Sequence, residues 1–111
     1  MAAAAAAPAA RGRLRIADRV YARLAEQAVR QALADEWARR STTAAPPRAS
    51  VLVVGGNARI TLHLELPYPA DLAELSRIAR DAVADHVSAL TGTPVLSVAV
   101  LVERLVPAVA S

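Results

Sequence analysis

The sequence predicts an α+β fold, a two-layer α/β sandwich with the element order α-β-β-α-β and a three-stranded sheet carrying both helices on one face. Three observations lead to this prediction. Apolar residues recur at helical spacing in two long stretches, near residues 18–39 and 71–91. Residues 59–66 alternate between apolar and polar, as a half-buried strand does. A pair of glycines separates that strand from another apolar run.

Composition limits what the chain can be. Its 111 residues suffice for one small domain, and with 3% aromatics and no Phe the core must consist of Val, Leu, Ile and Ala. The absence of Cys excludes disulfides and thiolate chemistry. The net charge of +3 and the pI of about 10.5 are compatible with nucleic acid or anionic lipid, but on a small domain they mostly favour solubility.

The first helix is predicted from about Asp18 to Arg39, within a single domain spanning residues 13–106. Residues 1–12 are expected to be a disordered Ala-rich tail, since an alanine tract broken by Pro8 has nothing to pack against. The arginines of residues 11–15 are interpreted as a solvated lead-in, with a salt-sensitive phosphate contact as the alternative. Trp37 is expected in the core or at its rim rather than exposed at a contact site.

Two strands and a hairpin turn follow a linker that contains Pro46 and Pro47. Ser50–Val54 is almost continuously apolar, which is typical of a strand that is central or covered on both faces. The turn at residues 55–57 suits residues that accept positive φ. The second strand is expected at Arg59–Leu66, and Pro67 is expected to break it.

The second helix is predicted at Asp71–Thr91, with Asp71 as N-cap and Glu74 as its capping-box partner. Gly92 is suited to the left-handed conformation that ends a helix, and Pro94 prevents continuation. The last strand is predicted from Val95 to Val102, and residues 107–111 are expected to be a loose C-terminal tail.

The predicted sheet leaves one face without helices. A right-handed crossover places both helices on the opposite face, and we favour the strand order 2-1-3 because the most apolar strand would then be central. The uncovered face is part apolar, and it is our candidate surface for a partner or for self-association. Its predicted members are Arg59, Thr61, His63, Glu65, Ser97, Ala99, Leu101 and Glu103.

No catalytic, cofactor-binding or metal-binding residue is predicted. His63 and His86 lack zinc-site spacing, and His86 is interpreted as a satisfied, partly buried imidazole rather than a ligand or base. Asp81 and Asp85 are interpreted as part of a solvated helix face rather than as paired catalytic carboxylates. The longest apolar run is too short to span a bilayer, which predicts a cytoplasmic protein without a transmembrane segment of its own.

Several features of the chain form a recognisable set: the helix opening at residues 16–20, the apolar hairpin of residues 51–54 and 60–66, and Tyr68 ahead of the second helix. The clearest part is the helix end and last strand, residues 87–95 and 98–102. With these features, residues 13–107 resemble the alkaline shock protein family, also called the envelope stress response family, as a divergent member. A departure lies at residues 35–41, where the family usually carries a Gly-Val pair.

The resemblance implies a non-enzymatic protein of cell-envelope stress, gathered at the inner face of the cell membrane through self-association and a small membrane-protein anchor. The expected partners are therefore copies of the chain itself, or family paralogues, and that anchor. The alternative function is a small basic nucleic-acid-binding module. It would use the arginines Arg11, Arg13, Arg15, Arg19 and Arg23.

Overall fold

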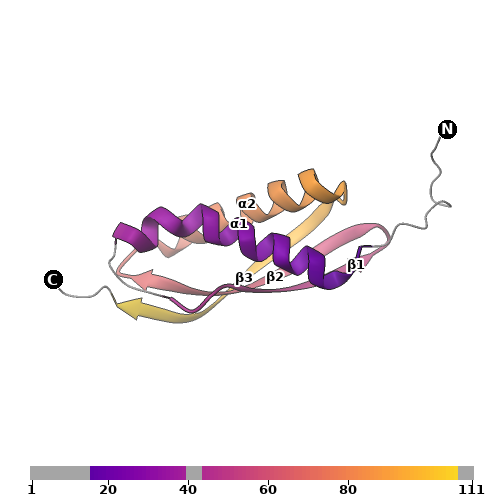
Figure 1. Cartoon of the computed structure of the whole chain (residues 1–111). Helices are drawn as coiled ribbons and strands as arrows, with labels where there is room; N and C mark the ends of the chain where they lie inside the picture. Colours follow the sequence, from indigo (N-terminus) through magenta and orange to yellow (C-terminus); the bar gives the residue numbers. More distant parts are fainter. Residues whose placement is uncertain (1–15, 40–43, 108–111) are drawn as a thin grey trace, which may run out of the picture.

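The structure, a computed structural model, describes residues 16–39 and 44–107. Two helices, α1 (Asp18–Arg39) and α2 (Leu72–Thr91), cover one face of a three-stranded mixed sheet. The strands are β1 (Arg48–Val54), β2 (Asn57–Tyr68) and β3 (Val95–Pro107). Figure 1 shows both helices on the same side of the sheet, which confirms the predicted α-β-β-α-β two-layer fold.

The ends of α2 follow from local chemistry, as predicted. The Asp71 side chain accepts a hydrogen bond from the Glu74 backbone N–H at 3.0 Å, which satisfies one of the free donors at the helix start. Gly92 adopts φ 74°, and its N–H donates to the Ser88 carbonyl. The reciprocal half of the capping box is replaced by an ion pair, because the Glu74 carboxylate contacts Arg77 at 2.6 Å.

The core lies between the helices and the helix-facing side of the sheet. Its β2 members are Ile60, Leu62, Leu64 and Leu66, all essentially inaccessible to solvent. Small and β-branched residues of α1 and α2, such as Ala25, Ala79 and Val83, approach them closely. The Tyr21 hydroxyl bonds to Thr93 Oγ1 at 2.8 Å, which ties α1 to the turn after α2.

The strand order is β1-β2-β3, so the predicted order 2-1-3 is wrong. β2 is central: it pairs antiparallel with β1 through the hairpin and parallel with β3. The reason is strand length. β1 has 7 residues, whereas β2 and β3 have 12 and 13, so only β2 can pair along nearly all of β3. The apolar character of β1 therefore does not indicate a central position, since Leu52 and Val54 are exposed.

The strands also extend beyond their predicted ends. Pro67 belongs to β2, where it is buried and lies opposite Val106, so it does not break the strand. This is tolerated because a strand can accommodate Pro where no ladder N–H is required. β3 continues to Pro107. The predicted tail of residues 1–12 and the rest of the C-terminal tail lie outside the described residues.

Candidate interaction surface

The sheet face opposite the helices is here called the open face, and its members come from all three strands. In the hairpin, Val54 lies opposite Asn57, which places Leu52 opposite Arg59 and Arg48 opposite His63. Between β2 and β3, Arg59 lies opposite Ser97, Thr61 opposite Ala99 and His63 opposite Leu101. The open face comprises Arg48, Ser50, Leu52, Val54, Arg59, Thr61, His63, Glu65, Ser97, Ala99, Leu101, Glu103 and Arg104.

All eight residues predicted for this face do lie on it. Glu103 sits at a shift in the β2–β3 register between Leu64 and Glu65. A bulge of this kind places two consecutive side chains on one side of a strand. Glu103 and Arg104 therefore both contact β2 residues of the open face, namely His63 and Glu65.

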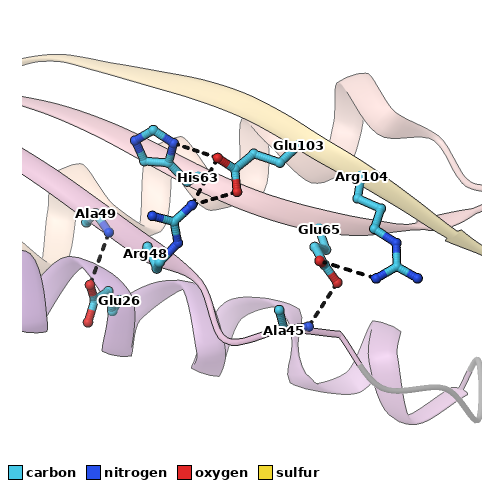
Figure 2. A network of polar contacts seen from close by, with 8 residues as sticks. All are labelled: Glu26, Ala45, Arg48, Ala49, His63, Glu65, Glu103 and Arg104. Atoms are coloured by element: carbon cyan, nitrogen blue, oxygen red, sulfur yellow. Dashed lines mark hydrogen bonds and ion pairs between the residues drawn. The ribbon is translucent and has the colours of Figure 1, made fainter.

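A polar cluster crosses the three strands. Arg48 Nη2 of β1 donates to both carboxylate oxygens of Glu103 of β3, at 2.8 and 3.0 Å. His63 Nδ1 of β2 lies 3.1 Å from Glu103 Oε2 (Figure 2). The hydrogen bond from Arg48 is the main cause that lowers the pKa of Glu103, with a smaller contribution from His63 and an opposing one from desolvation.

A second contact fixes the linker against the same face. Glu65 accepts a hydrogen bond from the Ala45 backbone N–H at 3.0 Å and lies 3.7 Å from Arg104 Nη1 (Figure 2). Exposed ion pairs of this kind contribute little to stability. These contacts connect charged side chains of all three strands across the open face.

Apolar side chains flank the polar middle on both edge strands. Leu52 and Val54 of β1 are each 58% exposed, and Leu101 of β3 is 50% exposed. The polar residues Arg59, Thr61 and His63 of β2 lie between them. The open face thus combines exposed aliphatic side chains with positioned charges, as protein–protein interfaces do.

The contribution of β1 was missed by sequence reasoning. The apolar run of residues 51–54 favours a central strand, and the predicted strand begins only at Ser50, whereas β1 begins at Arg48. The signal that predicts their place is the two-residue Gly55-Gly56 turn, both of whose glycines have positive φ. Such a turn fixes the hairpin register and thereby the face of each β1 side chain.

The other residues singled out in the sequence lie away from this face. Trp37 is half-buried against the core, as predicted, and lines a cavity of about 370 Å³ with Leu33, Pro46 and Leu64. His86 is partly buried between the helices, beside Gln31 and Asp85. The partly buried position is as predicted, and Nε2 of the imidazole has no hydrogen-bond partner among the residues described.

The charged helix residues singled out in the sequence are solvent-exposed wherever the structure describes them. Asp81 pairs with Arg77 at 3.0 Å, which confirms the solvated helix face. Arg19 and Arg23 are exposed on α1, whereas Arg11, Arg13 and Arg15 lie outside the described residues. Within residues 16–39 and 44–107, no three His, Cys, Asp or Glu side chains gather in a metal-binding arrangement.

Neither of the two helices, over the residues the structure describes, has the length and hydropathy needed to cross a membrane. Comparison of the chain with protein-family models, with curated proteins and with solved structures found no match.

Proposed function

We propose that this chain is a non-enzymatic interaction module of the envelope stress response. It acts as a scaffold at the cytoplasmic side of the cell membrane through self-association and a membrane-anchored partner. The observation that carries the proposal is the open face, a sheet surface that neither helix of the described residues covers and that exposes Leu52, Val54 and Leu101. The sequence resemblance of residues 13–107 to the alkaline shock protein family supplies the cellular setting.

The open face suits a protein partner for two physical reasons. Burying its aliphatic side chains against a partner lowers the free energy of the complex by about 25 cal/mol per Å² of apolar surface removed from water. Its Arg48–Glu103–His63 cluster presents charged groups of all three strands side by side on the same face. The aliphatic residues would supply affinity, and the charged residues would select partners with a complementary arrangement.

The test is capture of partners from detergent-solubilised native membranes by the tagged chain, with identification by mass spectrometry. Leu101→Glu places a charge at the exposed apolar side chain of β3 on the open face and should abolish capture. Because Leu101 is half exposed, the variant should keep the wild-type circular dichroism spectrum and melting temperature.

Leu90→Glu is the matched control. Leu90 is 60% exposed but lies on α2, in the helix layer on the opposite side of the sheet. It should leave capture of a small membrane protein unchanged. Equal capture by wild type and Leu101→Glu would contradict the proposal. Recovery of only ribosomal or nucleoid proteins, lost on nuclease treatment, would favour the nucleic-acid module that uses Arg19 and Arg23.

A further inference from the structure

The two edges of the sheet differ in how their backbone groups are used. At the β1 edge, the N–H of Ala49 donates to Glu26 Oε2 of α1 at 3.0 Å (Figure 2). β1 is short, begins with the charged residue Arg48, and has α1 packed against it. Natural sheets discourage edge-to-edge pairing through short edge strands, charges and covering elements. The β1 edge combines all three.

The β3 edge lacks the first two of these features over its central stretch, because β3 is long and this stretch is uncharged, although α2 packs against β3. Within residues 16–39 and 44–107, no strand lies beyond β3. Residues 97–102 pair with residues 59–64 of β2 without a register shift, so this stretch is a regular strand. It contains no charged residue and no Pro, and its sequence, Ser-Val-Ala-Val-Leu-Val, has high β-propensity. A regular, uncharged edge strand of this composition is a template for pairing with another strand.

We propose that two copies of this chain pair antiparallel through residues 97–102 of β3, which joins the two three-stranded sheets into one continuous sheet. The partner is a second copy because the stretch is complementary to itself. A two-fold axis beside Ala99 sets Ala99 opposite Ala99 and Ser97 opposite Leu101, so that residues of the same face lie opposite one another. The charged residues Glu103 and Arg104 then lie beyond the paired stretch, so like charges do not meet across the axis.

This arrangement rests on the proposed function, since it assigns the self-association to one edge of the sheet. A two-fold axis perpendicular to the sheet keeps the helices of both copies on one side. The open faces of the two copies therefore become one surface, with Ala99 and Leu101 of each copy beside the axis. A membrane-anchored partner would then meet a surface twice as wide as that of one chain.

The test uses two variants in the same cross-strand row of the open face. Ser50 of β1, Thr61 of β2 and Ala99 of β3 lie side by side in register, and Ser50 and Ala99 are both exposed. Ala99→Lys sets two lysines close together across the proposed axis, whereas Ser50→Lys puts the same charge on the same face at the other edge. We expect Ala99→Lys to raise the dimer Kd about tenfold or more in sedimentation velocity, which corresponds to about 1.4 kcal/mol or more, because like charges set opposite one another at an interface repel. Ser50→Lys should change the dimer Kd by less than about twofold relative to wild type.

Amide hydrogen exchange of the full chain supplies an independent readout. Backbone amides of residues 97–102 that point away from β2 should exchange faster on dilution, as the dimer dissociates. Three outcomes would overturn the edge pairing: a monomer at all concentrations, amides protected equally at every dilution, or equal weakening by Ser50→Lys and Ala99→Lys. The last result would place self-association on the open face. A monomer whose membrane capture still depends on Leu101 would leave the proposed function standing.

Discussion

The two faces of β2 carry different kinds of side chain and do different work. Toward the helices, Ile60, Leu62, Leu64 and Leu66 are buried and form the centre of the core. Toward the open face, Arg59, Thr61, His63 and Glu65 alternate with them and contact the side chains of β1 and β3. One strand thus holds the fold together on one side and orders a polar surface on the other. Along this one strand, the residues that face the helices are expected to control stability, and the residues between them are expected to control recognition.

The largest difference between the two faces is expected when one β2 side chain on each face is truncated. Leu62→Ala removes a fully buried side chain and should lower the free energy of unfolding by about 2–5 kcal/mol, since it leaves a cavity between the sheet and the helices. Arg59→Ala, on the open face, should cost less than about 1 kcal/mol. Urea denaturation followed by circular dichroism measures both. Similar losses from the two variants would show that the faces do not divide their roles in this way.

A smaller effect is expected from weakening the helix that covers the core side of β3. Asp71→Ala removes the acceptor for the Glu74 N–H and should lower the free energy of unfolding by about 1 kcal/mol. Asp71→Asn keeps a capping oxygen and is the control, expected to retain most of the wild-type stability. Thermal unfolding checks both variants, and capture through Leu101 should be unaffected by either. Loss of capture in Asp71→Ala at a temperature where it remains folded would link the cap to the open face.

The smallest effect is expected from the polar cluster of the open face. The pKa of Glu103 is lowered below its ordinary value of 4.5, chiefly by the Arg48 hydrogen bond. Its stabilising contribution is therefore complete above that ordinary value and is lost as the pH falls through the lowered folded value. Glu103→Gln should show a slightly shallower loss of stability below about pH 5 than wild type, measured by urea denaturation at a series of pH values.

Arg48→Gln provides the control for that pH profile. Arg48→Gln removes the main cause of the lowered pKa of Glu103. The free energies of unfolding of Arg48→Gln and the Arg48→Gln/Glu103→Gln double variant should therefore differ less across the pH series than those of wild type and Glu103→Gln. If Glu103→Gln changes the loss of stability below about pH 5 equally with and without Arg48, the hydrogen bond from Arg48 is not what lowers the pKa of Glu103.

Particular residues show how far local sequence signals reach in this chain. Asp71 and Gly92 bound α2 as predicted, because caps depend on the backbone of a few neighbouring residues. The alternation along residues 59–66 assigned each β2 side chain to its face, since the period of a strand is 2. The eight predicted open-face residues follow from the same period in β2 and β3.

The remaining features depend on neighbours distant in sequence. Leu52 and Val54 look like core residues because they are apolar, and only the place of β1 at the edge leaves them exposed. Arg104 joins the open face only because of the bulge beside Glu103. Pro67 remains in β2 because Val106 of the extended β3 lies beside it.

The sequence by itself therefore determined the helices, the hairpin and the composition of the layers, since these follow from periodicity, caps and chain connectivity. The tertiary structure alone decided which strand is central, where the bulges fall and which edge remains available. The physical reason is that strand order is selected by the total pairing and burial over the whole sheet. Here the 12-residue β2 offers β3 a longer partner than the 7-residue β1, and the chain pairs accordingly.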